Sequence, residues 1–320
     1  MAALLSIANV SVSFAQRRPL FARKSRSLLA VDNVSAEIAE GETLALVGES
    51  GSGKTTLGHV VAGLRRPSGG EVRLRGTPID SQGGRHAARG IQIVFQDPFS
   101  ALDPRMPVSD IISEPLRIQG VGTKGERRER ATLLVEQVGL PRDALNRYPH
   151  EFSGGQRQRI AIARALAPGP ELIVADEPLS ALDVSIQSQI LNLFRDVQER
   201  GKLSYLFISH DLSVVEHLAD RVAVLYLGRV IELGPRDDIF KRPAHPYTRA
   251  LLEAMPRIGA GKRRKRAIKG EMPSPLDPPP GCVFHPRCPI ARDICKSVVP
   301  RFEPLAARPA HAAACHFKEA

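Results

Sequence analysis

The sequence predicts an α/β fold in which helices cover a largely parallel β-sheet. Short apolar runs alternate along the chain with helical segments, as in strand–helix–strand units. One apolar run, residues 42–47, ends in a Gly/Ser-rich turn that leads into a helix, and another, residues 171–175, is followed by two adjacent carboxylates. Parallel sheets bind ligands at the carboxyl ends of their strands, so these two segments predict a binding site.

The remaining elements follow from local pattern. Buried or half-buried strands are predicted over residues 42–47, 71–80, 90–95, 171–175 and 203–209, with a hairpin over 221–233. Helices are predicted over residues 56–64, 124–138, 153–166, 185–200 and 213–219. Between residues 97 and 137 the chain is first rich in proline and then charged, which indicates an inserted helical region.

Charge is distributed unevenly along the 320 residues. The net charge is +11, and residues 257–320 account for +8 of it, with 13 Lys and Arg against 5 Asp and Glu. The same stretch holds all four cysteines and 10 of the 26 prolines. The length allows about two domains, and the basic surplus suggests an anionic partner: nucleic acid, a phosphorylated ligand or a membrane surface.

The compartment is predicted from what the sequence lacks. No apolar run reaches the roughly 18 residues of a transmembrane helix, and the N-terminus does not fit a secretory signal. We therefore expect a cytoplasmic protein with reduced thiols, in which cysteines bind a metal or pack as buried thiols more often than they form disulfides.

The turn after the first buried strand matches the phosphate-binding pattern G-x-x-x-x-G-K-[ST]. In such a loop the main-chain N–H groups surround phosphate oxygens, Lys54 reaches the β- and γ-phosphates, and the Thr55 hydroxyl ligates Mg²⁺. A flexible turn that matches by chance is the alternative, which the strand before it and the helix after it disfavour. The predicted nucleotide-binding residues are Gly48, Glu49, Ser50, Gly51, Ser52, Gly53, Lys54, Thr55 and Thr56.

The carboxylates Asp176 and Glu177 follow the buried strand at 172–175. Asp176 suits the Mg²⁺ shell, and Glu177 projects in another direction, from which it could polarise an attacking water. Alone, the pair is also compatible with an ordinary solvated strand end.

Four further motifs make the chain resemble the ATP-binding cassette (ABC) proteins. They are a signature Phe152-Ser-Gly-Gly-Gln156, a D-loop Leu179-Ser-Ala-Leu-Asp183, a switch-histidine loop Ile208-Ser-His210-Asp211 and a Q-loop Val94-Phe-Gln96. The resemblance implies a P-loop NTPase of RecA-like type, built as an ABC cassette with an inserted helical subdomain.

The same resemblance implies roles for individual residues. Glu177, His210 and Gln96 are expected in catalysis, with Mg²⁺ held by Thr55, Gln96 and Asp176. Phe14 stands where the family often places a ring against adenine, although an ordinary strand residue is an equal alternative. The residues expected to face ATP bound by a second subunit are Ser153, Gly154, Gly155 and Gln156, with the D-loop residues Ser180, Ala181, Leu182 and Asp183 beside them.

Three segments narrow the resemblance to the ATPase subunits of oligopeptide/dipeptide importers: 96–105, 147–155 and 243–252. It implies an ATPase domain over 1–235, with the helical subdomain at about 97–153, and a C-terminal extension over 236–320. The implied partners are two membrane-spanning permease subunits, a second ATPase, identical or not, and, indirectly, a solute-binding protein. Peptide is the expected cargo, with nickel, glutathione or another small solute as alternatives, and the expected location is the cytoplasmic face of the inner membrane.

The cysteines Cys282, Cys288, Cys295 and Cys315 are spaced C-x5-C-x6-C-x19-C, which is neither a zinc ribbon nor a common ferredoxin pattern. The importer subfamily has this arrangement, in some members with a [4Fe–4S] cluster, so a cluster is predicted. Zinc, with His285 or His316 as further ligands, and metal-free thiols are the alternatives.

The basic run Lys262–Arg266 precedes this module and predicts a solvated linker, or contact with anionic lipid. Nucleic acid is not expected, because no aromatic residues accompany the run. Two other classes of function were weighed. A soluble ABC ATPase of DNA repair or translation usually carries a coiled-coil insertion or a second cassette, which this chain lacks, and a non-enzymatic iron–sulfur module would not need the ATPase motifs.

Overall fold

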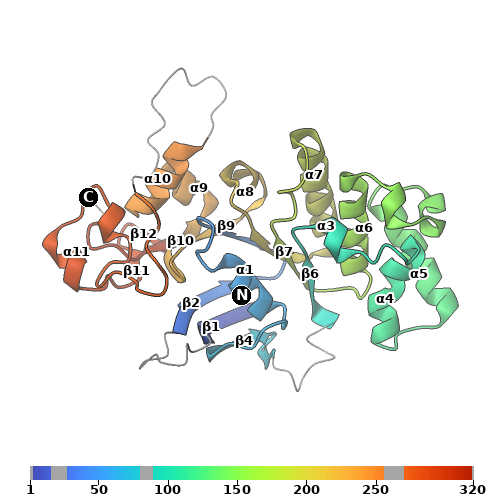
Figure 1. Cartoon of the computed structure of the whole chain (residues 1–320), viewed down its shortest axis with the longest axis horizontal. Helices are drawn as coiled ribbons and strands as arrows, with labels where there is room; N and C mark the ends of the chain where they lie inside the picture. The colour runs from blue at the N-terminus through green and yellow to red at the C-terminus, as the bar shows by residue number, and fades with distance from the viewer. Residues whose placement is uncertain (1–2, 16–26, 80–88, 256–269, 319–320) are drawn as a thin grey trace, which may run out of the picture.

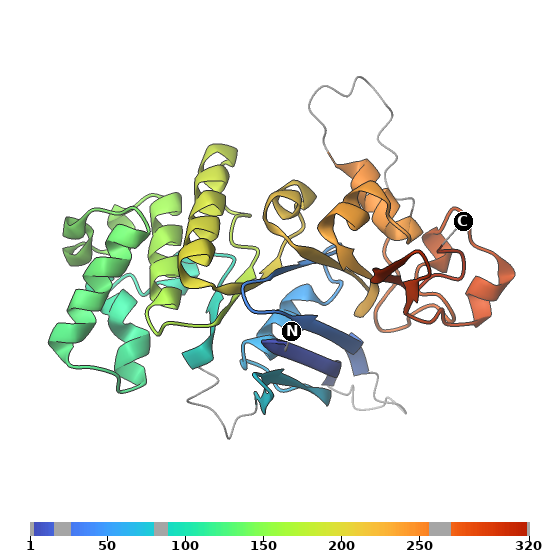
Figure 2. The same ribbon diagram turned by 180° about the vertical axis from the view of Figure 1, so that it is seen from behind.

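The computed structural model describes residues 3–15, 27–79, 89–255 and 270–318. An α/β core occupies the middle of the molecule, with a helical subdomain at one end and the C-terminal extension at the other (Figure 1). The view from behind shows the same order, with a second, smaller sheet beneath the core (Figure 2). The Lys262–Arg266 run lies outside the described residues.

The larger sheet has the strand order β11-β12-β10-β9-β3-β8-β7-β6. Strand β3 pairs in parallel with β8 and β9, and β7 pairs in parallel with β6 and β8, which confirms the predicted parallel core. Strands β3, β7 and β8 are buried along their whole length, because helices cover both faces of a parallel sheet. The core strands are β3 (Thr43–Val47), β6 (Ile91–Val94), β7 (Leu172–Asp176), β8 (Ser204–Ile208), β9 (Arg221–Tyr226) and β10 (Arg229–Pro235).

The smaller sheet is antiparallel, in the order β2-β1-β4-β5. Its strands are β1 (Leu5–Ala15), β2 (Ser27–Ile38), β4 (Gly69–Leu74) and β5 (Thr77–Pro78). The prediction of one strand over 71–80 is therefore wrong: Arg75 and Gly76 adopt φ of +48° and +76° and turn the chain back between β4 and β5. Apolar side chains of this sheet and helix α1 (Lys54–Val61) share one hydrophobic cluster with strands of the core.

The predicted inserted helical region lies between β6 and β7. It contains α3 (Pro98–Ala101), α4 (Val108–Ile118), α5 (Lys124–Gln137), two 3₁₀ turns, η1 (Arg142–Asn146) and η2 (Pro149–Glu151), and α6 (Gly154–Leu166). Helix α5 begins with a capping box, in which Thr123 and Glu126 satisfy each other's main-chain N–H groups. The apolar faces of α4, α5 and α6 form one core with α7 (Val184–Gly201).

The C-terminal extension continues the core sheet. After α8 (Leu212–Leu218) and the β9–β10 hairpin come α9 (Arg236–Lys241), α10 (Pro246–Ala254), the 3₁₀ turn η3 (His285–Arg287), α11 (Asp293–Ser297), β11 (Glu303–Leu305) and β12 (Arg308–Ala313). Strand β12 pairs with β10, where the buried Glu232 accepts hydrogen bonds from the Ala244 and His245 N–H groups and pairs with His311. A buried charge needs such partners, so the extension is joined to the core by both strand pairing and side chains.

Among the described residues, no helix combines the length and the hydropathy needed to cross a bilayer.

Candidate nucleotide site

The Gly-rich loop joins the carboxyl end of β3 to the amino end of α1. Gly48, Gly51 and Gly53 all have positive φ, and Gly53 is the N-cap of α1. A Cβ atom on Gly48 or Gly53 would lie 2.3 Å from a main-chain oxygen, so neither position has room for a side chain. The loop therefore presents main-chain N–H groups at a helix N-terminus, which is the geometry that binds phosphate.

Lys54 lies across the inside of this loop. Its side chain is 5% exposed, and Nζ donates hydrogen bonds to the carbonyls of Gly48 at 2.8 Å and Glu49 at 3.0 Å. Burial lowers the pKa of Lys54, while the carboxylates of Glu177, Asp176 and Glu49 act in the opposite direction. A bound phosphate would give the ammonium of Lys54 an anionic partner in place of these two carbonyls.

Asp176 ends β7 directly opposite the start of α1. The Thr55 hydroxyl donates to its Oδ1 at 3.0 Å, and His59 Nε2 lies 3.9 Å from its Oδ2. Burial raises the pKa of Asp176, and the hydrogen bond from Thr55 opposes that shift. One carboxylate and one hydroxyl suit Mg²⁺, which usually takes one or two protein oxygens and fills its other positions with phosphate and water. The residues present therefore fit the predicted metal.

The three predicted catalytic residues meet at the carboxyl ends of neighbouring strands. Glu177 Oε2 accepts a hydrogen bond from Gln96 Nε2 at 3.2 Å and lies 3.0 Å from His210 Nδ1. Gln96 follows β6, Glu177 follows β7 and His210 follows β8, so the parallel order of these strands brings the residues together. The His210 side chain is 58% exposed and that of Glu177 is 17% exposed, which leaves this group open to a ligand.

The backbone turns sharply at Glu177. Its φ is +47°, an uncommon value for a residue with a side chain, and its N–H donates to the Ile208 carbonyl at 3.0 Å. Beside it, a cavity of about 70 Å³ is lined by residues that include Glu177, Ser180 and His210. That volume holds one or two waters, within reach of the carboxylate.

The predicted signature residues form the N-terminus of α6. Ser153 and Gln156 cap this helix reciprocally, with Ser153 N–H donating to Gln156 Oε1 at 3.0 Å. A Cβ atom on Gly155 would lie 2.5 Å from the Ile186 side chain, so the glycine permits close packing against α7. Helix α6 lies beyond β6 and β7 from α1 (Figure 1), so the signature and the phosphate loop are on separate parts of the chain.

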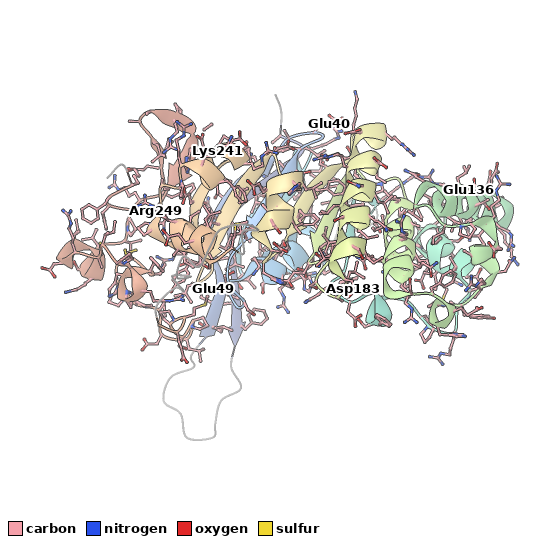
Figure 3. All side chains as sticks on the ribbon, turned by 90° about the horizontal axis from the view of Figure 1, so that it is seen from above. Glu40, Glu49, Glu136, Asp183, Lys241 and Arg249 are labelled. Carbon is pink, nitrogen blue, oxygen red and sulfur yellow. The ribbon has the colours of Figure 1, made fainter. Side chains whose placement is uncertain are left out.

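The D-loop residues connect this region to Glu177. The Ser180 hydroxyl donates to the Glu177 carbonyl at 3.0 Å, and the Asp183 carbonyl accepts the first hydrogen bonds of α7. Asp183 is the N-cap of α7 and lies beside the helical subdomain (Figure 3).

Phe14 lies near the end of β1 and is half-buried. The Arg65 guanidinium covers one face of its ring, 4.3 Å from the centroid. Its other surroundings include the cluster of the smaller sheet, against which it packs. The adenine contact stays a prediction.

The four cysteines all lie in the extension and are free thiols, with Cys282 and Cys295 buried. Burial raises the pKa of Cys282 to about 11, and the other three cysteines contribute in the same direction. Within the described part of the chain, no three His, Cys, Asp or Glu side chains are arranged to hold a metal ion. The described residues therefore give no support to the predicted [4Fe–4S] cluster or to its zinc alternative, because the ligands of a metal must converge on it.

Two side chains outside the predicted nucleotide-binding residues contact the phosphate loop. The Tyr247 hydroxyl accepts a hydrogen bond from the Glu49 N–H at 2.9 Å, and Arg287 forms an ion pair with the Glu49 carboxylate. Tyr247 falls within a segment that marked the importer resemblance, residues 243–252, but the spacing of the residues gives no signal for either contact.

Comparisons with known proteins identify the family of the chain. The family model described as ABC transporter matches residues 31–180, and the model described as oligopeptide/dipeptide transporter, C-terminal region, matches residues 231–295. The oligopeptide transport ATP-binding protein AppF of Bacillus subtilis is 49% identical, covering 98% of this chain and 97% of its own. The dipeptide transport ATP-binding protein DppF of Escherichia coli is 50% identical, covering 89% and 86%.

Solved structures give the same result for the core. The dimeric ATP-binding cassette MJ0796, in a post-hydrolysis state bound to ADP and Pi, aligns with a TM-score of 0.63 and 29% identity over 72% of this chain and 98% of that one. Fold and site thus define an ATPase of the ATP-binding cassette class. Within that class, the chain belongs to the family of oligopeptide/dipeptide ABC transporter ATP-binding proteins.

Proposed function

We propose that this chain is the ATP-hydrolysing subunit that energises the import of dipeptides or oligopeptides across the cytoplasmic membrane. The observation that carries the proposal is the meeting of Gln96, Glu177 and His210 at the sheet edge that also holds Lys54 and Asp176. The peptide cargo is supported by the names of the relatives and by the extension they share with this chain.

The site suits γ-phosphoryl transfer to water. The loop N–H groups and Lys54 bind the phosphate tail, with Nζ exchanging the Gly48 and Glu49 carbonyls for phosphate oxygens. Glu177 accepts a proton from a water molecule while the water oxygen attacks the γ-phosphorus. The bond from the γ-phosphorus to the β-phosphate oxygen breaks, which releases ADP and phosphate. Thr55 and Asp176, with Gln96 as the predicted third ligand, would hold Mg²⁺. When bound, this ion neutralises phosphate charge.

His210 and Gln96 both contact the Glu177 carboxylate and thereby hold it in one orientation. Either side chain would also lie near a γ-phosphate that binds between Glu177 and Lys54. Positioning and charge neutralisation, more than covalent chemistry, supply the rate enhancement in this class of reaction.

The exposed N-terminus of α6 implies a second ATPase subunit, identical or paralogous. The Ser153 hydroxyl, with the N–H groups of the glycines after it and the helix dipole, would face an ATP that α1 of the same chain does not hold. Two permease subunits would bind the helical subdomain, and ATP-driven closure of the two cassettes would supply the two states of transport. The chain would then lie at the cytoplasmic face of the membrane, without contact with the solute-binding protein.

The test is ATPase activity of the transporter purified from solubilised membranes with its permease subunits. A peptide-loaded binding protein should stimulate hydrolysis, whereas the same assay with nickel-loaded or glutathione-loaded binding proteins should not. Stimulation only by the nickel-loaded or the glutathione-loaded binding protein would show that the cargo is that solute and not peptide. Failure to co-purify with any membrane protein would count against the importer role.

The predicted iron–sulfur cluster needs a test of its own, because the arrangement of the described thiols does not support it. Its support is the four-cysteine spacing and the resemblance to importers in which some members carry a cluster. Anaerobic purification followed by iron and zinc analysis, with absorption near 400 nm, decides between cluster, zinc and free thiols. Absence of both metals would leave the cysteines as buried thiols of a small apolar core.

A further inference from the structure

Glu49 is unusual in the phosphate loop because all of its polar groups are engaged. Its carbonyl accepts a hydrogen bond from Lys54 Nζ at 3.0 Å, and its N–H donates to the Tyr247 hydroxyl at 2.9 Å. Its carboxylate accepts two hydrogen bonds from the Arg287 guanidinium, at 2.7 and 3.0 Å. One residue thus connects the phosphate-binding lysine to two side chains of the C-terminal extension.

The two contacts from the extension come from distant parts of the sequence. Tyr247 lies on α10, 198 residues after Glu49, and Arg287 lies in η3, 238 residues after it. Figure 3 places Glu49 where the extension meets the core. The extension is therefore part of the structural surroundings of the nucleotide site.

Arg287 is itself held firmly. Its side chain is only 6% exposed, and its guanidinium also contacts the Tyr226 hydroxyl at 3.4 Å. In the same short segment between Cys282 and Cys288, Phe284 packs edge-on against Tyr226 and Tyr247, with ring centroids 5.4 and 5.3 Å apart. A bidentate guanidinium–carboxylate pair on such a rigid base fixes both the position and the direction of Glu49.

Electrostatics give this pair a consequence for nucleotide binding. Glu49 is the one acidic residue between Gly48 and Thr55, in a loop that must accept the negative charges of ATP. Without Arg287 its carboxylate would lack that neutralising partner beside the phosphates and would repel them. The loop carbonyl that Lys54 contacts would also lose its support.

We propose that the cysteine-containing extension supports ATP binding through Glu49: Arg287 neutralises and positions its carboxylate beside the phosphates, and Tyr247 holds its main-chain N–H. The inference rests on the proposed ATPase function and adds to it a role for the extension in the nucleotide site of the same chain. Neither residue touches the reacting atoms, and both act through Glu49.

The test measures the ATP dissociation constant of the full chain with a fluorescent ATP analogue, alongside KM, kcat and thermal melting. Arg287→Ala should weaken ATP binding and raise KM by roughly tenfold, with kcat changed by less than about threefold. Arg287→Lys, which keeps the charge but loses the fork, should fall between Arg287→Ala and the wild type. Tyr247→Phe, which keeps the ring, should cost roughly threefold in affinity.

The decisive variant removes the carboxylate that Arg287 neutralises. Glu49→Gln combined with Arg287→Ala should recover most of the lost affinity, because the repulsion is gone; a merely structural role for Arg287 would leave the loss unchanged. The matched control is Lys296→Ala, which breaks an exposed ion pair with Asp293 in the same extension and should bind ATP as the wild type does. Wild-type affinity in Arg287→Ala, or no recovery in the double variant, would overturn the proposal.

The measurement also separates this proposal from the proposed function. ATP affinity is measured on the purified chain without cargo or permease, so a wrong cargo leaves the test intact. If the wild-type chain itself binds no ATP, the proposed function fails first.

Discussion

The two halves of the nucleotide site differ in how completely one chain builds them. The enclosed half, as we call the part that would hold the phosphate tail, is fixed from within the chain: Lys54 is 5% exposed, and Glu49 is held by Tyr247 and Arg287. The half that would face the γ-phosphate is open, with the His210 side chain 58% exposed and its Nδ1 3.0 Å from Glu177 Oε2. The contacts that fix the phosphate loop lie within the chain, whereas the open half is where the proposed second subunit would complete the site.

The difference has a physical reason. A loop whose Lys54 and Glu49 are fixed by hydrogen bonds within the chain keeps its shape without ligand, which lowers the cost of binding. A catalytic group that switches between states needs freedom to move, and exposed side chains with few contacts have it. The largest effects are expected from mutations that remove either ATP binding or hydrolysis and leave the other unchanged.

Glu177→Gln should abolish most hydrolysis and leave ATP binding intact. The amide keeps the shape and the contacts to Gln96 and His210 but cannot accept a proton, so we expect kcat to fall by about 10²–10⁴. The measurement is the rate of ATP hydrolysis, with the ATP dissociation constant determined in parallel. The control is Glu136→Gln, which changes a carboxylate on the exposed face of α5. Turnover like that of the wild type would remove Glu177 from the role of base.

Lys54→Ala should act on the other half and weaken ATP binding itself, by roughly 100-fold. The expected loss is that of a charge-assisted contact to phosphate from a buried ammonium. Lys241→Ala, which removes an exposed ammonium paired with Asp237, is the matched control and should leave affinity unchanged. An unchanged dissociation constant in Lys54→Ala would show that the loop N–H groups bind ATP without it.

The parts of this site that local sequence could predict are those set by short-range chemistry. The turn from Gly48 to Thr55 needs glycines at fixed positions, and the buried strand before Asp176 is a continuous apolar run. Parallel pairing then brings Gln96, Glu177 and His210 together, so their convergence follows from strand order alone.

Contacts that depend on the packing of distant elements could not be predicted in this way. The Arg287–Glu49 pair spans 238 residues and arises because the extension packs against β9 beside the loop. The β4–β5 turn, in contrast, was predictable: Gly76 is a strong turn residue, although Arg75 at positive φ carries no turn signal of its own. The thiol arrangement is likewise set by packing, which cysteine spacing does not determine.

The extension's support of the enclosed half should depend on pH through His245. This side chain is buried, caps α10 by accepting from the Tyr247 N–H, and lies beside Glu232. Burial lowers its pKa to about 4 from 6.5, so the folded state requires it neutral. Its contribution to stability is complete above pH 6.5 and is lost as the pH falls from there towards 4, because the unfolded chain takes up the proton first.

The expected size of this effect is about 3 kcal/mol between pH 7 and pH 4, since each pKa unit corresponds to 1.36 kcal/mol. His245→Asn keeps a capping acceptor without the titration and should show a flatter loss of unfolding free energy in urea series at several pH values. His150→Asn, an exposed histidine, should match the wild type. Parallel curves for wild type and His245→Asn would exclude His245 as the source of acid sensitivity.

The smallest expected effect concerns the N-terminus of α6, which would face the nucleotide of a second subunit. Ser153→Ala should reduce hydrolysis by the assembled cassette pair roughly tenfold while each chain binds ATP normally, because it removes the hydroxyl that we propose contacts the partner's nucleotide. Loss of the cap alone costs about 1 kcal/mol of stability, and Thr123→Ala removes an equivalent capping box on α5, away from any nucleotide. The two variants should melt alike and differ in turnover. Equal turnover in both variants would show that Ser153 acts only as a helix cap. It would also remove the proposed contact between α6 and the nucleotide of a second subunit.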